Sequence, residues 1–245
     1  MVKVKICGLR RPEDIAAANE VKPDYIGFIF APSRRRITPE EAVGLNRLLS
    51  RGIKKVGVFV NGEIDFVVAT AKKVNLDVVQ LHGEEDHDYI AELRRRLPEQ
   101  TRVWLKIGMP VKRCDSGLSD NGSTGGSGRG STEGNRTVSF VYEPEGLENL
   151  EGVDALLLDT AAGHGAEAVG GTGQTFAWDL ARDLCRKYKV IVAGGLSPDN
   201  VQTAIKTLNP YGVDVSTHVE TEGYKNKDKM ALFVSRVREA RQYHG

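Results

Sequence analysis

The sequence predicts an α/β protein with a (β/α)8 TIM-barrel fold, formed as a single domain over residues 1–245. Short apolar strands alternate with amphipathic helices about every 25 residues, which is typical of βαβ units in a parallel sheet. Eight strands can be counted, and the run Leu156-Leu157-Leu158 indicates a strand buried on both faces. A doubly wound open sheet is the alternative, but the count of eight and the lack of a GxGxxG motif after the first strand argue against it.

Composition and charge exclude several classes of protein. Hydrophobic residues make up 40% and charged residues 27% of the chain, and 34 basic against 33 acidic residues give a net charge of +1. We therefore expect a soluble protein with no general affinity for nucleic acid. No run reaches the roughly 18 apolar residues that a membrane span needs, and Met1–Lys5 lacks the apolar core of a signal peptide. Cys7, Cys114 and Cys185 are far apart, which argues against disulfides and favours the reducing cytoplasm.

Five strands are expected before the middle of the chain, at residues 2–7, 24–30, 54–60, 77–81 and 102–107. The first helix begins at Pro12-Glu13-Asp14, and the second begins at Thr38-Pro39-Glu40-Glu41, which combines an N-cap with proline. Asn61 is expected to cap the third helix, and the fourth is expected over Glu84–Leu97.

A Gly/Ser/Asn-rich segment, residues 114–137, interrupts the pattern after strand five. It contains almost no apolar residue, so burial cannot offset the entropy of ordering it, and we interpret it as a flexible insertion. Residues 138–150 could hold a short replacement for the fifth helix.

The pattern then resumes with strands at residues 153–159, 190–193 and 212–215. Helices are expected at Trp178–Tyr188, from the capping sequence Ser197-Pro198-Asp199-Asn200 onward, and from Lys227 to about Tyr243.

Polar residues at the predicted strand ends point to a site. The loops that follow the strands of such a barrel lie at one end, and most characterised sites are found there. Seven side chains share that position: Cys7, Arg35, Gln80, His82, Asp159, Asp214 and Ser216. Each also has a plain structural explanation, since a cysteine is often a small buried hydrophobe, an arginine run a solvated loop and an aspartate a turn cap. Their shared location favours a site.

Glycines in the last three loops predict an anion-binding end. Gly170-Gly171-Thr172-Gly173, Gly194-Gly195 and Ser216-Thr217 follow strands six, seven and eight. Glycine lets backbone N–H groups approach an anion, and barrels often bind phosphate with their last two loops and a short extra helix. We therefore expect a phosphorylated small molecule as ligand. No His-x-x-x-His motif, cysteine pair or carboxylate cluster suggests a metal.

Several motifs together resemble the phosphoribosylanthranilate isomerase family. They are Lys5-Ile6-Cys7-Gly8, Gly27-Phe28-Ile29-Phe30, Val56-Gly57-Val58-Phe59-Val60-Asn61, Val79-Gln80-Leu81-His82-Gly83, Leu158-Asp159-Thr160, Gly170-Gly171-Thr172-Gly173-Gln174-Thr175-Phe176 and Ala193-Gly194-Gly195-Leu196-Ser197-Pro198-Asp199-Asn200-Val201. They cover almost the whole chain except the insertion. The resemblance implies a cofactor-free TIM barrel of tryptophan biosynthesis that rearranges an aminoaldose phosphate to an aminoketose phosphate.

The resemblance also implies roles for single residues. Cys7 would be the general base and Asp159 the general acid, and Arg35 would contact the anthranilate carboxylate. The other residues expected to bind substrate, most of them around its phosphate end, are Gln80, His82, Gly171, Gly173, Gly194, Gly195, Asp214, Ser216 and Thr217. Neither a metal nor a cofactor is implied. The sequence leaves open whether the chain is a monomer or a homodimer.

This sequence departs from the family after strand eight. The family usually has Ser-Ser-Gly-Val-Glu there, whereas this chain has Ser216-Thr217-His218-Val219-Glu220, so that an imidazole takes the place of a glycine. Two alternatives therefore accompany the isomerase hypothesis. One is another phosphate-sugar isomerase on the same barrel, and the other is an inactive barrel that only binds a phosphorylated ligand. Substrate profiling distinguishes the first, and an intact phosphate site argues against the second.

Overall fold

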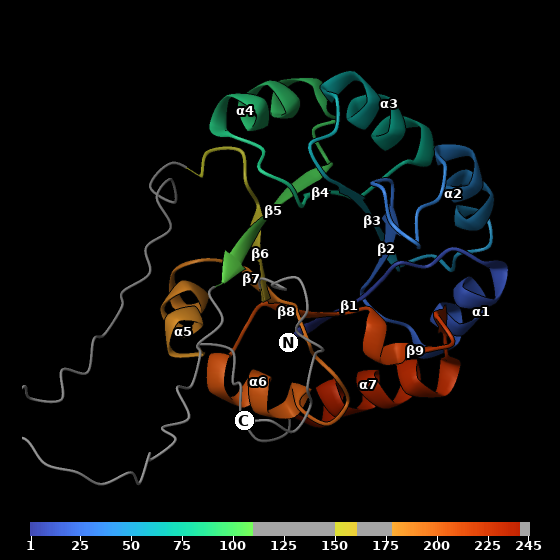
Figure 1. Ribbon diagram of the computed structural model, residues 1–245, viewed down its shortest axis with the longest axis vertical. Helices are drawn as coiled ribbons and strands as arrows, with labels where there is room; N and C mark the ends of the chain where they lie inside the picture. Colours follow the sequence, from blue (N-terminus) through green and yellow to red (C-terminus); the bar gives the residue numbers. More distant parts are fainter. Residues whose placement is uncertain (110–149, 161–177, 241–245) are drawn as a thin grey trace, which may run out of the picture.

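The structure, a computed structural model, describes residues 1–109, 150–160 and 178–240 and confirms the predicted barrel (Figure 1). Eight parallel strands form a closed sheet in sequence order, and β8 closes the ring by pairing with β1. The strands are β1 Lys3–Cys7, β2 Tyr25–Ile29, β3 Lys54–Phe59, β4 Val78–Leu81, β5 Arg102–Met109, β6 Ala155–Thr160, β7 Val190–Val192 and β8 Gly212–Val215. The open-sheet alternative is thereby excluded.

Seven α-helices of the described residues surround this barrel (Figure 1). They are α1 Pro12–Val21, α2 Pro39–Asn46, α3 Ile64–Val74, α4 His87–Arg96, α5 Trp178–Lys187, α6 Val201–Leu208 and α7 Lys227–Glu239. A short 3-10 helix, η1 Thr217–Val219, and a hairpin of β9 Glu220–Thr221 and β10 Tyr224–Lys225 lie between β8 and α7. The predicted insertion at 114–137 and residues 138–149 lie outside the described residues.

Three helix starts differ from the prediction, each because a polar side chain is used elsewhere. Asn61 does not cap α3, since its backbone is left-handed and its side-chain oxygen accepts from the Glu84 backbone N–H. That loop delays α4 until His87, where the Asp86 carboxylate caps the helix by accepting from the Tyr89 N–H. Residues 197–200 form a turn before α6, in which the Asn200 side chain accepts from the Ser197 N–H.

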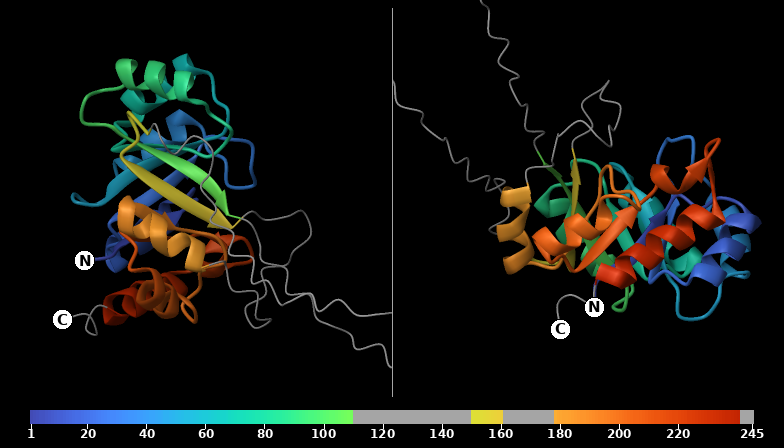
Figure 2. Two further views of the ribbon diagram at one scale, coloured as in Figure 1. Left: turned by 90° about the vertical axis from the view of Figure 1, so that its left-hand side faces the viewer. Right: turned by 90° about the horizontal axis from the view of Figure 1, so that it is seen from below.

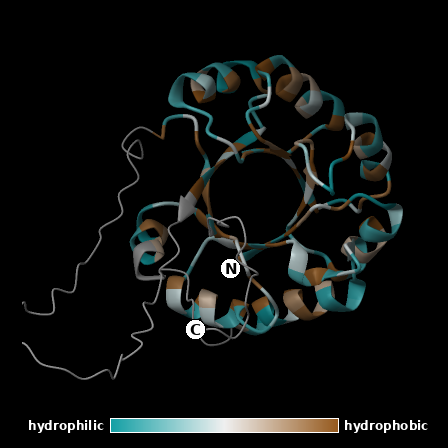
Figure 3. Cartoon of the chain, viewed as in Figure 1, coloured by the Kyte–Doolittle hydropathy of each residue, from teal (hydrophilic) through white to brown (hydrophobic). Residues whose placement is uncertain are grey.

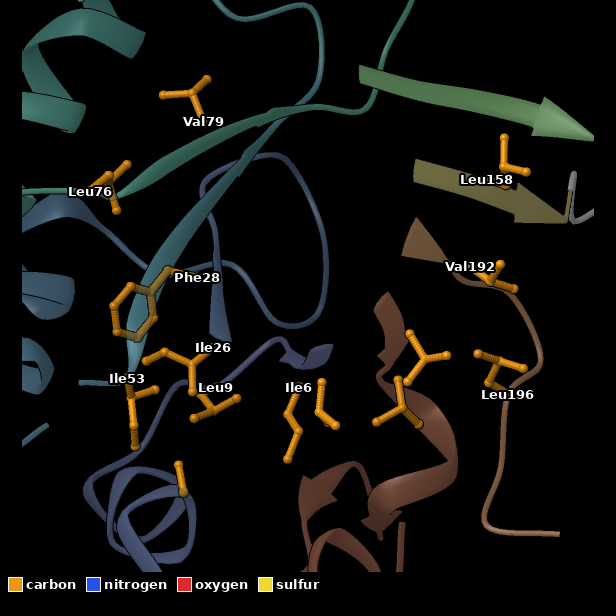
Figure 4. Close-up of a cluster of buried hydrophobic side chains, with 14 of the residues drawn as sticks. Ile6, Leu9, Ile26, Phe28, Ile53, Leu76, Val79, Leu158, Val192 and Leu196 are labelled. Carbon is orange, nitrogen blue, oxygen red and sulfur yellow. The ribbon is translucent and has the colours of Figure 1, made fainter. Parts of the chain in front are cut away.

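Two layers of apolar side chains hold the barrel. The layer between strands and helices includes Ile6, Phe28 and Leu158, part of the cluster drawn in Figure 4. Figure 3 shows the corresponding hydrophobic colouring on the strands and on stretches of the surrounding helices. The layer inside the barrel contains Trp104 and Tyr25, whose rings pack edge to face at 4.9 Å. Fully burying one large apolar side chain contributes about 1.5–3 kcal/mol, so both layers stabilise the ring.

All strands run in one direction, which gives the barrel two different ends. The arrowheads of β5 and β6 mark one end, and the chain's N-terminus lies at the other (Figure 2). We call the end of the barrel formed by the C-terminal ends of the strands the mouth. In the part of the chain that the structure describes, no helix combines the length and apolarity needed to cross a lipid bilayer.

Candidate active site

The first functional side chain, Cys7, is the last residue of β1 and lies almost completely buried. Its neighbour across the pair of strands β1 and β2 is Gly27. A β-carbon at position 27 would lie 2.7 Å from the Cys7 sulfur, so the glycine is required to make room for the thiol. The Cys7 carbonyl accepts a hydrogen bond from the Ser216 hydroxyl at 3.1 Å, which joins the end of β1 to the residue after β8.

A buried ion pair lies beneath Cys7. Lys5 is two residues earlier on β1 and pairs in register with Asp214 on β8. Its ammonium donates to Asp214 Oδ2 at 2.7 Å, while Asp214 Oδ1 has no partner among the described residues. Burial lowers the pKa of Lys5, but the charges of Asp214 and Cys7 outweigh this effect and hold that pKa above its usual value. Lys5 is therefore a fixed cation inside the barrel.

The same surroundings decide the state of the Cys7 thiol. Burial raises the pKa of Cys7, and the positive charges of Lys5 and Lys225 oppose this only in part. In the protein without ligand, the pKa of this thiol therefore lies above its usual value. The free-energy cost of desolvating a thiolate here exceeds the stabilisation that the two buried ammonium groups provide.

The mouth also holds a carboxylate and an imidazole. Asp159 is the second-last residue of β6, and His82 directly follows β4. His82 Nε2 is 3.4 Å from Asp159 Oδ2, and Gln80 Nε2 is 3.1 Å from His82 Nδ1. The His82 and Asp159 side chains are 28% and 27% exposed, so a ligand in the mouth can reach both. The structure thus brings together three residues that the sequence placed at strand ends.

Arg35 is anchored by a carboxylate that the sequence analysis did not single out. The Arg35 guanidinium donates from Nε to Glu220 Oε1 at 2.6 Å and from Nη2 to Glu220 Oε2 at 2.8 Å. Nη2 also donates to the Thr217 hydroxyl at 3.1 Å. Gly8 is required for this placement, because a β-carbon there would lie 2.5 Å from Arg35 Cδ. These bonds leave Nη1 of Arg35 without a described partner and available to an anion.

Glu220 also binds Lys225, which extends the network to Ser216. Lys225 Nζ donates to Glu220 Oε1 at 2.7 Å and to the Ser216 carbonyl at 2.9 Å. Burial by itself raises the pKa of Glu220, but the hydrogen bonds from Arg35 and Lys225 hold it below its usual value. Arg34 contacts the same carboxylate at 3.0 Å, so three cationic side chains share one carboxylate. The surplus positive charge favours an anionic ligand here.

The predicted phosphate end is described only in part. Gly194 and Gly195 follow β7 with φ of 78° and 64°, a backbone conformation that favours glycine. Ser216 and Thr217 form the start of η1, directly after β8. This is the arrangement of a final loop and short extra helix that many barrels use for phosphate. His218 lies within η1 without a positive φ, so its backbone does not require a glycine. Gly171 and Gly173 lie outside the described residues.

The sequence analysis did not single out four residues near the mouth, and only Lys5 and Lys106 have a weak signal in their pattern. Lys5 alternates with apolar residues and looked like the solvent face of a strand, although both faces of a barrel strand are buried. Lys106 on β5 alternates with the interior residue Trp104, which indicates an inward position near the mouth. Glu220 and Lys225 lie in a hairpin whose pairing no sequence pattern announced.

Two surface cavities of the described residues are not lined by Cys7, His82 or Asp159. One, of about 500 Å³, is lined by the loops after β3 and β4, and the other, of about 420 Å³, lies between α1 and α7. We place the active site at the mouth instead, because the thiol, the buried ion pair and the His82–Asp159 contact are there. No group of three metal-ligating side chains occurs within residues 1–109, 150–160 and 178–240, and the lack of a metal stays a prediction.

Fold and site define a class of protein. A closed (β/α)8 barrel whose mouth carries a thiol, a carboxylate and an imidazole, next to a cationic cluster, has the groups for acid–base chemistry on an anionic small molecule. The comparison with known proteins specifies the class. The profile described as N-(5'phosphoribosyl)anthranilate isomerase matches residues 4–130 and 137–236. The chain belongs to this family of isomerases.

Individual relatives agree over nearly the full length. The N-(5'-phosphoribosyl)anthranilate isomerase of Thermoanaerobacter sp. (strain X514) is 41% identical over 238 residues, which are 97% of this chain and 98% of the relative. A crystal structure of phosphoribosyl anthranilate isomerase in complex with reduced 1-(o-carboxyphenylamino)-1-deoxyribulose 5-phosphate is 30% identical with a TM-score of 0.70, covering 98% of this chain and 100% of the other. Monomers of the dimeric Thermotoga maritima enzyme give the same identity, TM-score and coverage.

Proposed function

We propose that the protein converts N-(5-phosphoribosyl)anthranilate to 1-(2-carboxyphenylamino)-1-deoxyribulose 5-phosphate. This Amadori rearrangement is a step of tryptophan biosynthesis and needs no cofactor. The observation that carries the proposal is the placement of Cys7, His82 and Asp159 around one barrel mouth in a chain of this family. A relative that binds the reduced form of the same product supports it.

Asp159 is the proposed general acid. Its carboxyl group donates a proton to the ring oxygen of the ribose while the bond between C1 and that oxygen breaks. The nitrogen lone pair then forms the C1=N bond of a Schiff base, and Asp159 is left as a carboxylate. The 3.4 Å contact with His82 and the partial exposure of the Asp159 side chain support this role, because the acid must be both oriented and reachable.

Cys7 is the proposed general base. Its thiolate removes the proton from C2 of the Schiff base, the electrons form the C1=C2 bond, and the nitrogen regains its lone pair. The resulting enol becomes the ketone when C1 gains a proton and the C2 hydroxyl loses one. Because burial raises the pKa of Cys7, the thiolate has to form beside a cation, and Lys5 and Lys225 are the cations that offset part of this rise.

The two anionic ends of the substrate fit two regions of the mouth. The free Nη1 edge of Arg35 is the proposed contact for the anthranilate carboxylate. The loops after β7 and β8 are the proposed contact for the phosphate, through Gly194, Gly195, Ser216 and Thr217. Gln80 Oε1 and Asp214 Oδ1 are buried acceptors without described partners, which suits them to accept from hydroxyl groups of the sugar.

Location and assembly follow as expectations. The cysteine usage supports a cytoplasmic location. A homodimer and a monomer both stay open, and a dimeric relative from Thermotoga maritima makes the homodimer worth testing.

The proposal is tested with purified protein and freshly prepared phosphoribosylanthranilate, whose fluorescence is lost as it is consumed. We expect enzyme-dependent loss of fluorescence and formation of the aminoketose phosphate. Turnover of other aldose phosphates at a higher kcat/KM would favour the alternative that the protein is another phosphate-sugar isomerase. Binding of the product without any turnover would favour the inactive barrel and contradict the proposal.

A further inference from the structure

A line of contacts leads from the barrel interior to the proposed general acid. Gln80 on β4 is 1% exposed, and its side-chain Nε2 lies 3.1 Å from His82 Nδ1. The opposite ring nitrogen, His82 Nε2, lies 3.4 Å from Asp159 Oδ2. The imidazole therefore has one nitrogen facing an amide and the other facing a carboxylate. The roles of donor and acceptor along this line follow from the chemistry of the three groups.

The amide decides the tautomer of the imidazole. An amide nitrogen can only donate, so His82 Nδ1 has to accept and carries no proton. In a neutral imidazole the proton is then on Nε2, which faces a carboxylate oxygen that can only accept. This one arrangement places a donor opposite an acceptor at both contacts. The distance of 3.4 Å is long for a hydrogen bond, as is common for catalytic contacts in a protein without its ligand.

The reverse orientation of the amide meets a conflict. Gln80 Oε1 would then face Nδ1 and require a proton there, and a neutral imidazole would present a bare Nε2 to the Asp159 carboxylate. When Asp159 is ionised, only an imidazolium would satisfy both partners. The two arrangements predict different protonation of Nδ1, which can be measured.

We propose that Gln80 is a positioning residue that holds His82 in its neutral Nε2–H tautomer, so that His82 donates to Asp159 Oδ2 and orients the general acid. The proposal rests on the proposed function of Asp159. With Oδ2 engaged, Oδ1 is the oxygen that carries the proton to the substrate. Fixing one carboxylate oxygen restricts the rotation of the side chain, and such orientation lowers the barrier of proton transfer.

The tautomer is read directly by nitrogen-15 NMR of the imidazole rings at pH 8, above the usual titration range of histidine. The chain has five histidines, and the signals of His82 are assigned by their loss in His82→Asn. We expect an unprotonated Nδ1 and a protonated Nε2 in the wild-type protein. A protonated Nδ1, whether in the other tautomer or in an imidazolium, would overturn the proposal. This measurement does not depend on turnover, so it is separate from the test of Asp159.

Variants of Gln80 test the positioning role. Gln80→Met removes the amide and keeps a side chain of similar size. We expect His82 to populate both tautomers and kcat to fall roughly tenfold. This loss is smaller than the loss of about a hundredfold or more expected when a proton-transfer group itself is removed. The substitution also removes the sugar-hydroxyl contact proposed for Gln80 Oε1 but keeps the contacts to the two anionic ends, so KM should change less than kcat, by no more than about threefold. Gln202→Met, on the surface of α6, is the matched control and should leave kcat unchanged.

Gln80→Glu keeps the size but turns the donor into an acceptor, so it should move the proton to Nδ1 and also lower kcat. It serves as the second variant if Gln80→Met does not fold. Wild-type kcat in a folded Gln80 variant with a changed tautomer would overturn the positioning role. Wild-type kcat in Asp159→Asn, in contrast, would remove Asp159 from the mechanism and would contradict the proposed function instead.

Discussion

Replacing Glu220 by glutamine tests the network that anchors Arg35. The Glu220 side chain is 4% exposed and accepts from Arg35, Lys225 and Arg34 at 2.6–3.0 Å. Glu220→Gln keeps the shape of the side chain but removes its charge and one acceptor oxygen. Lys225, at 1% exposure, then has no anionic partner among the described residues, whereas Arg34, at 58%, can be solvated by water.

The magnitude follows from the burial of the pair. Breaking a buried ion pair by removing one partner costs about 3–5 kcal/mol, because the remaining charge is desolvated and unpaired. For a chain of this length, 1 kcal/mol shifts the melting temperature by roughly 2–4 °C. We therefore expect Glu220→Gln to lower the melting temperature by about 10 °C. Loss of the Arg35 anchor should also raise KM, with a smaller effect on kcat, since Arg35 holds the anthranilate carboxylate in the proposed complex.

The pH dependence of this difference has a definite sign. Arg35 and Lys225 hold the pKa of Glu220 below its usual value in the folded protein, despite the opposing effect of burial. The stabilisation is therefore fully present above the unfolded-state pKa of about 4.3, and it is lost as the pH falls through the lower folded-state pKa. The stability gap between wild type and Glu220→Gln should be constant from pH 8 to about 5 and shrink below about 4.3.

Thermal melting and urea unfolding at several pH values measure both effects. Glu222→Gln is the control, because Glu222 is exposed in the same hairpin, and its stability should stay within about 0.5 kcal/mol of wild type. Equal melting temperatures for Glu220→Gln and wild type at pH 7 would refute the reasoning, since they would show that the buried cations need no carboxylate.

Three further substitutions or treatments have expected outcomes. Gly8→Ala should cost about 1–3 kcal/mol in urea unfolding and raise KM, because φ is 82° and the new β-carbon would displace Arg35; an unchanged KM would contradict this. Cys7 in the ligand-free protein should react slowly with iodoacetamide at pH 8 and faster at higher pH, since burial raises its pKa; rapid alkylation at pH 7 would show a thiolate. Lys5→Met should destabilise by about 3–5 kcal/mol by leaving Asp214 buried without its cation, and Asp214→Asn in the same chain should recover part of the loss; strict additivity would mean that the two do not interact.

The architecture could be predicted because every level of the sequence agrees on it. Strand and helix periods alternate, proline and acids mark helix starts such as Pro12, and eight strands can be counted. The starts of α3 and α4 could not be predicted, because they depend on hydrogen bonds between two loops that meet only after folding. Asn61 in one loop bonds to Glu84 and Glu85 in the other. Local capping rules describe each helix alone and do not contain that contact.

The part of the candidate site that depends only on which residues end the strands could be predicted. Cys7, His82 and Asp159 lie where the closed barrel requires, and the register of β1 with β8 brings Asp214 close to Lys5. The partners that tune these groups could not be found, since Lys5 is hidden in an alternating pattern that also fits a solvated strand. The raised pKa of Cys7 likewise follows from burial, which is a property of the folded chain.

The central claim is that Cys7 takes the proton in the rearrangement, and steady-state kinetics of Cys7→Ala with phosphoribosylanthranilate test it most directly. Cys185→Ala is the matched control, because Cys185 lies on α5 and packs against the outer core. We expect kcat to fall at least about a hundredfold in Cys7→Ala with a much smaller change in KM, while Cys185→Ala turns over like wild type. Wild-type kcat in folded Cys7→Ala would contradict the account, since it would make Cys7 a buried structural residue and leave the base to be found among His82 and Asp214.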